Sequence, residues 1–169
     1  MTISIKLASD KADIEIASNL CREWLDWHWE NYPSDWPLEG NPMERGRFKD
    51  TLQNLSNIHA RPRGAIFVAH LGNQPVGCVM YNEYSAGVAE FNRMFVNEAG
   101  RGHGLGLLLL DKMFAQMIED GYQKVVFSSA VFLTHAKAMY EAAGFSNMPH
   151  PQGFPDEWKP YVYFMERPL

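Results

Sequence analysis

The chain has 169 residues, 46% of them hydrophobic, which suffices for one domain with a real core and is short for two. Its formal net charge of −5, with lysines and arginines scattered along the chain, argues against nucleic-acid binding and suits a cationic amine ligand better. Cys21 and Cys78 lie too far apart for a disulfide framework or a Cys-x-x-Cys metal pair, so we expect buried, reduced thiols and no metal site.

Hydrophobic periodicity and turn residues predict helices and strands that alternate within one domain, residues 1–169. In chain order we expect a strand at 3–7, a helix from about 10 to 31–33, a loop at 32–42, a helix at 44–57, a hairpin of strands 65–71 and 76–84, a strand at 88–96, a glycine loop at 101–106, a helix closed by Gly121, a strand at 123–129, a helix ending at Gly144, a loop at 146–160 and a strand at 161–166. These elements define an α/β fold.

Two amphipathic helices carry the clearest patterns. The first has an apolar stripe of Ala17, Leu20, Cys21, Trp24 and His28, on which we also place Trp27 as core. The helix after the glycine loop places on one face Gly106, Leu110, Met113, Phe114, Met117 and Ile118. The longest apolar run, residues 105–110, is too short to cross a bilayer, and the N-terminus lacks a signal-peptide hydrophobic region. We therefore expect a cytoplasmic protein with no membrane partner.

Residues 91–106 are the most informative stretch, because a strand leads through a short turn into a loop with alternating glycines and then a leucine-rich helix. Glycines let the backbone approach an anion closely, and the free N–H groups and dipole of a helix N-terminus favour negative charge. The pattern predicts a site for a phosphorylated cofactor on Arg101 to Gly106. No Gly-Lys-Ser/Thr closes a Walker loop, and the glycine spacing is wrong for a dinucleotide-binding G-x-G-x-x-G.

The remaining pattern is R-x-x-G-x-G, formed by Arg101, Gly104 and Gly106 after a strand that ends at Val96. It resembles the acetyl-CoA motif of the GNAT N-acetyltransferase superfamily. Residues 136–145, AKAMYEAAGF, resemble the second GNAT signature, a helix with a tyrosine that ends in Gly-Phe. The resemblance covers nearly the whole chain and implies a GNAT fold, with a mixed twisted sheet flanked by helices, and acetyl-CoA as co-substrate.

The same resemblance implies where the co-substrate binds. The backbone of the fourth strand would pair with the pantetheine arm in a splayed gap beside the fifth strand, and the glycine-loop amides would hold the pyrophosphate. The implied cofactor-binding residues are Met94, Phe95, Val96, Arg101, Gly102, His103, Gly104, Leu105, Gly106 and Tyr140. His103 receives a backbone role alone. Relatives often carry a polar residue where this chain has Leu133, so Thr134 or Ser129 would have to supply that contact.

Acyl transfer to an amine needs a proton acceptor and a proton donor. An alkyl ammonium with a pKa near 10.4 must lose its proton, and Glu90 is our candidate base, with Glu83 in reserve. We place Glu90, Asn92 and Met94 on one strand face; the alternative for Glu90 is a solvated or ion-paired glutamate. Family resemblance gives Tyr140 the role of donor to the leaving thiolate, the alternative being a core tyrosine.

The acceptor side is the least defined. First-helix and second-helix segments usually border the acceptor in this superfamily, so we expect Trp29, Tyr32 and Trp36 to contact it. The prediction is an N-acetyltransferase that acts on a primary amine of a small molecule or peptide by direct attack in a ternary complex, with a homodimer as one possible assembly. A CoA-binding regulatory module without transfer, or an acyltransferase with another acyl group or acceptor, stays open as an alternative.

Overall fold

The computed structural model describes residues 1–41 and 43–169; Pro42, the last residue of the predicted loop, lies outside them. In chain order the elements are β1 (Ile3–Leu7), α1 (Lys11–Asn31), α2 (Arg45–Gln53), α3 (Leu55–Ile58), β2 (Ala65–Leu71), β3 (Gln74–Ser85), β4 (Val88–Val96), the 3-10 turn η1 (Glu98–Gly100), α4 (Leu105–Glu119), β5 (Lys124–Ala130), α5 (Thr134–Ala142), β6 (Ser146–Met148), the 3-10 turn η2 (Asp156–Trp158) and β7 (Val162–Pro168).

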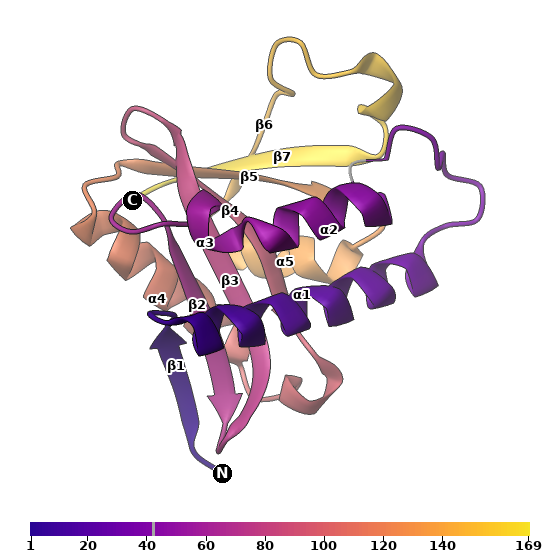
Figure 1. The fold of residues 1–169 in the computed structure, drawn as a ribbon. Helices are drawn as coiled ribbons and strands as arrows, with labels where there is room; N and C mark the ends of the chain where they lie inside the picture. Colours follow the sequence, from indigo (N-terminus) through magenta and orange to yellow (C-terminus); the bar gives the residue numbers. More distant parts are fainter. Residues whose placement is uncertain (42) are drawn as a thin grey trace.

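The strands form one mixed sheet in the order β1-β2-β3-β4-β5-β7-β6. Within the described chain, β4 and β5 run parallel and every other neighbouring pair is antiparallel. Figure 1 shows α1, α2 and α3 in front of the sheet and α4 and α5 behind it. We call these faces the α1 side and the α4 side. The predicted α/β architecture is confirmed.

Local sequence signals set most element boundaries as expected. The Asp10 side chain caps α1 by accepting a hydrogen bond from the Asp13 N–H at 2.8 Å, and the helix stops two residues before Pro33. The hairpin of β2 and β3 turns at Gly72, whose φ of +59° suits glycine. Gly144 likewise follows α5 with a φ of +96°.

Several predictions about the fold were wrong in detail. The helix expected at 44–57 is two helices, because Asn54 leaves helical geometry and its N–H bonds to the Thr51 carbonyl at 3.0 Å. The loop expected at 146–160 contains β6, which pairs with β7, and η2. Ile118 is 56% exposed, not core, and Trp27 is half-buried outside both core clusters. Periodicity misplaced these two side chains because they lie at the margins of their helix stripes.

The core consists of two clusters separated by the sheet. On the α4 side, apolar residues of α4 pack with Tyr140, Phe145 and inward residues of the strands. On the α1 side, residues of α1, α2 and α3 pack on β2, β3 and β4. Cys21 and Cys78 belong to this second cluster as buried free thiols, as predicted, and Trp24 packs at its margin.

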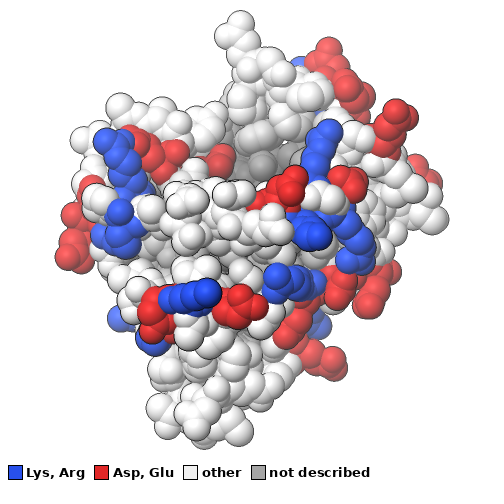
Figure 2. All heavy atoms as spheres, viewed as in Figure 1, with Lys and Arg blue, Asp and Glu red and all other residues white. Residues whose placement is uncertain are grey.

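Charges of both signs are interspersed over the face shown in Figure 2. Within residues 1–41 and 43–169, no helix combines the length and apolarity needed to cross a membrane. The same residues hold no cluster of three or more histidine, cysteine or acidic side chains suited to a metal ion.

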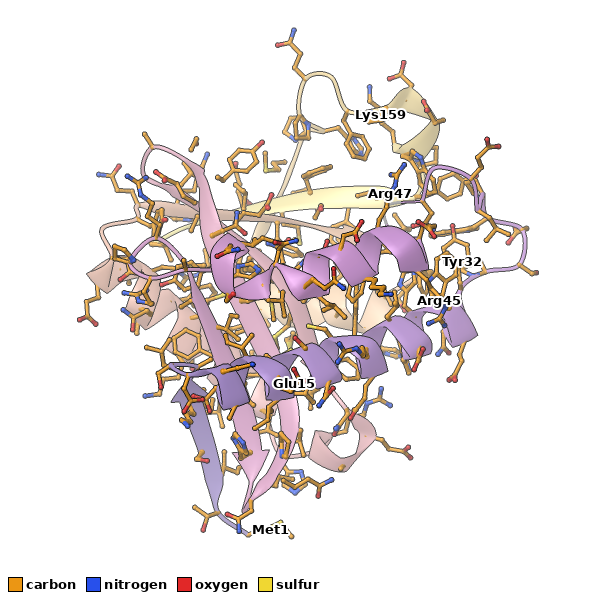
Figure 3. All side chains as sticks on the ribbon, viewed as in Figure 1. Met1, Glu15, Tyr32, Arg45, Arg47 and Lys159 are labelled. Atoms are coloured by element: carbon orange, nitrogen blue, oxygen red, sulfur yellow. The ribbon has the colours of Figure 1, made fainter. Side chains whose placement is uncertain are left out.

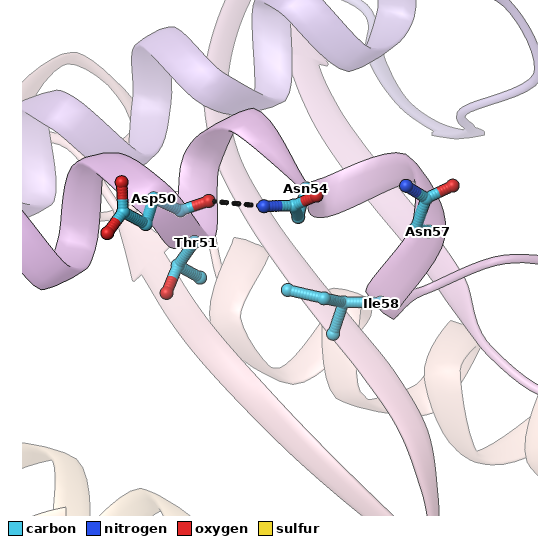
Figure 4. Close-up of a pocket in the computed structure, with 5 residues that line it drawn as sticks. All are labelled: Asp50, Thr51, Asn54, Asn57 and Ile58. Atoms are coloured by element: carbon cyan, nitrogen blue, oxygen red, sulfur yellow. Dashed lines mark hydrogen bonds between the residues drawn. The ribbon is translucent and has the colours of Figure 1, made fainter.

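One shallow hollow lies on the outer surface of α2 and α3 (Figure 4). It is lined by Asp50, Thr51, Asn54, Asn57 and Ile58, and the Asn54 Nδ2 donates to the Asp50 backbone carbonyl at 2.9 Å. None of these residues belongs to β4, β5 or the glycine loop. We therefore assign the hollow no part in the site described next.

Candidate active site

The central feature of the site is a wedge between β4 and β5. These parallel strands pair at Val88 with Lys124, at Ala89 with Val125 and at Glu90 with Val126, and their pairing ends there. Beyond that point β4 still pairs with β3 and β5 still pairs with β7. The two inner edges therefore present unpaired backbone groups to each other, which an extended ligand can satisfy as an added strand does.

The loop after β4 leads from this wedge into α4. Gly102 and Gly104 have φ values of +79° and +69°, and a Cβ at either position would meet nothing within 4 Å. The loop is thus held by glycine conformation and open to solvent, and Gly104 is the N-cap of α4. Free N–H groups of the first helical turn, together with the helix dipole, make this a favourable position for a phosphate.

The residues in and next to the glycine loop contact the loop itself, the core and α5. The His103 Nδ1 lies 3.0 Å from the Arg101 carbonyl oxygen and 3.3 Å from that of Gly100, so the imidazole folds back on its own loop. Leu105 is buried in the α4-side core. A Cβ at Gly106 would lie 2.8 Å from the Met139 Sδ, so glycine at this position allows α4 to approach α5.

Tyr140 lies on the α4 side of the sheet, at the point where β4 and β5 begin to diverge. Its ring contacts Phe91 of β4 and Phe127 of β5, with centroids 5.7 and 4.4 Å away, and Phe145 closes the cluster. The side chain is 5% exposed, and burial, with Tyr163 nearby, raises the pKa of its hydroxyl well above the ordinary value. Tyr140 is therefore a neutral phenol across the physiological pH range, placed between the two strands that diverge.

Glu90 lies at the same point of the wedge on the α1 side. Its neighbours Ala89 and Phe91 enter the α4-side core, so Glu90 between them faces the α1 side. The register agrees, because Glu90 pairs with Asn82, and Asn82 lies two residues from Met80 of the α1-side core. Burial raises the pKa of the half-buried Glu90 carboxyl, while Asn92, Arg93 and Asn82 oppose that shift. The sheet thus separates the two candidate catalytic residues.

The prediction that Glu90, Asn92 and Met94 share one strand face was wrong. Arg93 and Met94 form a bulge opposite Val79, and the bulge interrupts the alternation of side chains. Met94 consequently packs on the α4 side, against the helix that follows the glycine loop, while Phe95 enters the α1-side core. Nothing in the sequence pattern marks this bulge.

The reserve candidate for the base and the residues considered for a side-chain contact to the cofactor arm have the following surroundings. Glu83 of β3 forms an ion pair with Arg63, which occupies its carboxylate. Leu133 is the N-cap residue of α5 and makes no side-chain cap bond. Thr134 is exposed, and Ser129 of β5 is half-buried opposite Tyr163 of β7.

The predicted acceptor residues meet in an aromatic cluster beyond the open end of β5. Trp29 packs on Tyr32 at 4.8 Å between centroids, and Tyr32 packs on Trp36 at 5.8 Å. Figure 3 shows Tyr32 at the end of α1 and Arg45 at the start of α2. The Tyr32 hydroxyl donates to the Pro37 carbonyl at 2.5 Å, which ties the loop to the helix.

This aromatic cluster has two members that the sequence pattern does not indicate, Phe132 and Tyr161, and a third, His28, that we expected only on the apolar stripe of the first helix. Phe132, two residues after β5, contacts Tyr32 and Trp36, and Tyr161, just before β7, contacts Trp36 at 4.7 Å. His28 is 4% exposed among four rings, and within the described residues neither ring nitrogen has a hydrogen-bond partner. Burial lowers its pKa to about 4, so the imidazole is neutral. Phe132 and Tyr161 are far from α1 in sequence, and only the fold brings them to Tyr32 and Trp36.

A wedge between parallel strands, followed by a helix N-terminus with free N–H groups, can hold a ligand that combines an extended arm with a phosphate group. The family model described as Acetyltransferase (GNAT) family matches residues 21–145. The IAA acetyltransferase of Azospirillum brasilense is 30% identical over 130 residues, which span 76% of this chain and 80% of that protein. The chain belongs to the GNAT acetyltransferase family and is an acyltransferase.

Solved structures agree on the fold. A GNAT-family acetyltransferase from Staphylococcus aureus superimposes with a TM-score of 0.76 at 18% identity over 99% of both chains. The PaiA N-acetyltransferase from Thermoplasma acidophilum, solved with coenzyme A, gives a TM-score of 0.70 at 16% identity over the full length of both chains.

Proposed function

We propose that this protein transfers an acetyl group from acetyl-CoA to a primary amine of a small molecule or peptide. The observation that carries the proposal is the wedge beyond Glu90 and Val126, which opens directly beside the glycine loop. An extended pantetheine arm suits the unpaired strand edges, and a pyrophosphate suits the exposed helix N-terminus. In this arrangement the thioester lies between Glu90 and Tyr140.

Cofactor binding in this proposal relies on backbone groups. Met94, Phe95 and Val96 offer their main chain to the pantetheine, and residues 101–106 offer their amides to the pyrophosphate. The left-handed conformations of Gly102 and Gly104 support this assignment, because the space around both glycines is open. The PaiA relative, whose structure contains coenzyme A, has the same fold.

The chemistry assigns one proton transfer to each side of the sheet. Glu90 accepts the ammonium proton, the free amine attacks the thioester carbonyl, and a C–N bond forms. The C–S bond then breaks, and Tyr140 donates its phenol proton, or a hydrogen bond, to the departing thiolate; the attacking nitrogen loses its second proton through solvent as the amide forms, which leaves Tyr140 a neutral phenol again. The raised pKa of Glu90 makes it a stronger base, and the raised pKa of Tyr140 keeps the phenol protonated, which favours its role as a hydrogen-bond donor to the thiolate.

Direct attack in a ternary complex is the route we propose. Cys21 and Cys78 are both buried in the α1-side core and lie on α1 and β3, not in the wedge, so neither is placed as an acyl-accepting nucleophile. Trp29, Tyr32 and Trp36 are our proposed acceptor contacts. All three are partly exposed at the open end of β5.

The test is a screen of primary amines with acetyl-CoA, in which a thiol-reactive dye reports released CoA. We expect release that depends on one class of amine, and mass spectrometry of that amine should show one added acetyl group. Binding of acetyl-CoA without release by any amine would favour a regulatory module. Faster release from propionyl-CoA or with an alcohol acceptor would favour a different acyl group or acceptor.

A further inference from the structure

Arg93 combines a strained backbone with a buried charge. Its φ is +51°, and within the described chain it is the one non-glycine residue in the left-handed region. That conformation is unfavourable for an L-residue and persists only where the surroundings enforce it. Arg93 also lies at the bulge of β4, three residues beyond Glu90, where the pairing of β4 with β5 ends.

The surroundings of Arg93 form a clamp. Its Nη2 hydrogen-bonds to the His59 Nε2, its Nε donates to the Met80 Sδ at 3.1 Å, and its carbonyl accepts from the Cys78 Sγ at 3.4 Å. The His59 Nδ1 lies 2.8 Å from the Tyr81 carbonyl, so that nitrogen carries the proton and Nε2 is free to accept from Arg93. His59 is 3% exposed, and burial and Arg93 lower its pKa to about 4, which keeps it neutral.

This guanidinium forms no ion pair with a carboxylate within the part of the chain that the structure describes. The titratable groups facing it are His59 at the end of α3, Cys21 of α1, Cys78 of β3 and Glu90 of its own strand. His59 is neutral. The hydrogen bond between the two thiols lowers the pKa of Cys21 and raises that of Cys78, and both thiols lie in the α1-side core, not in the wedge. Of these groups Glu90 lies at the wedge, so the positive charge of Arg93 bears on the proposed reaction through Glu90.

We propose that Arg93 is a positioning residue for acyl transfer: clamped by His59 and Met80, it holds the bulge of β4 and places a positive charge on the same side of the sheet as Glu90. The bulge turns Met94 toward α4 while Glu90 stays on the α1 side. At the wedge, the positive charge of Arg93 favours the ionised form of the Glu90 carboxyl. The inference rests on the proposed role of Glu90 as base.

The decisive measurement is the titration of Glu90 itself, followed by NMR of protein with ¹³C-labelled glutamate carboxyls and assigned by the signal lost in Glu90→Gln. Arg93→Gln and Arg93→Lys both lose the guanidinium and keep an N–H donor for His59, but only Lys keeps the charge. We expect the Glu90 midpoint in Arg93→Gln to lie about one pH unit above that in Arg93→Lys. Equal midpoints in the two variants would overturn the proposal.

A second variant tests the clamp without changing any charge at neutral pH. His59→Ala removes the acceptor of the Arg93 hydrogen bond, and we expect amide hydrogen exchange at Arg93 and Met94 to become at least tenfold faster than in the wild type. Unchanged exchange would show that the bulge needs no clamp. Neither measurement needs an acceptor amine, so both are independent of the pH–rate test of Glu90→Gln described below.

Discussion

The two sides of the wedge present different chemistry. On the α4 side the glycine loop offers backbone amides, and the neighbouring side chains of Leu105 and Met94 are apolar and pack in or against the core. On the α1 side Glu90 and Arg93 are polar side chains with shifted pKa values, and an aromatic cluster lies beyond them. A site made of backbone depends on chain conformation, whereas a site made of side chains changes with single substitutions. We therefore expect cofactor binding and acceptor choice to respond to different mutations.

Glu90→Gln should give the largest effect, because it keeps shape and hydrogen bonding but cannot accept a proton. We expect turnover at neutral pH to fall by about a hundredfold to a thousandfold. Wild-type rate should rise with pH through the pKa of Glu90 to a plateau, while the variant recovers only toward the acceptor's own pKa near 10. Stopped assays over a pH series measure both curves.

The matched control is Glu83→Gln, which removes a nearby carboxylate that is paired with Arg63. Its pH–rate curve should keep the wild-type midpoint. Parallel curves for Glu90→Gln and the wild type would remove Glu90 from the base role.

Tyr140→Phe should lower kcat by about a hundredfold and leave acetyl-CoA affinity unchanged, because the hydroxyl acts as the thiolate leaves. Tyr122→Phe is its control, since the Tyr122 hydroxyl donates to the Arg63 carbonyl at 2.5 Å outside the site. That control should lose stability by about 1 kcal/mol and keep its kcat. Wild-type turnover in Tyr140→Phe would reduce Tyr140 to a core residue.

Gly104→Val should weaken acetyl-CoA binding by about tenfold, equivalent to one lost hydrogen bond to a charged group. Calorimetry with acetyl-CoA measures the affinity directly. Gly121→Val is matched, because Gly121 has a φ of +95° and open space around it but follows the opposite end of α4. Equal affinities in the two variants would place the pyrophosphate elsewhere.

Trp36→Leu should have the smallest effect and act on the acceptor side alone. We expect the acceptor KM to rise roughly three- to tenfold, the worth of one aromatic contact, with the acetyl-CoA KM unchanged. Phe154→Leu, in a separate cluster with His150 and Phe164, is the control and should change neither constant. A change in the acetyl-CoA KM would contradict the division between the two sides.

The sequence alone determined the fold class and the glycine loop before α4. Glycines, prolines and hydrophobic periodicity are local signals, and they correctly predicted the hairpin, the extent of α1, the end of α5 near Gly144, and the loop before α4. The GNAT assignment rested on two such local motifs and is confirmed. The roles of Glu90, Tyr140 and the cofactor-binding residues remain predictions.

Tertiary structure decided which residues meet at the site. The bulge at Arg93 reversed the expected face of Met94, because an extra residue in one strand shifts the alternation that any sequence pattern assumes. His59, 34 residues before Arg93, and Phe132, far from Trp36, became partners only through packing across elements. Contacts of this kind depend on how the sheet and helices close on one another, and local sequence periodicity carries no information about them.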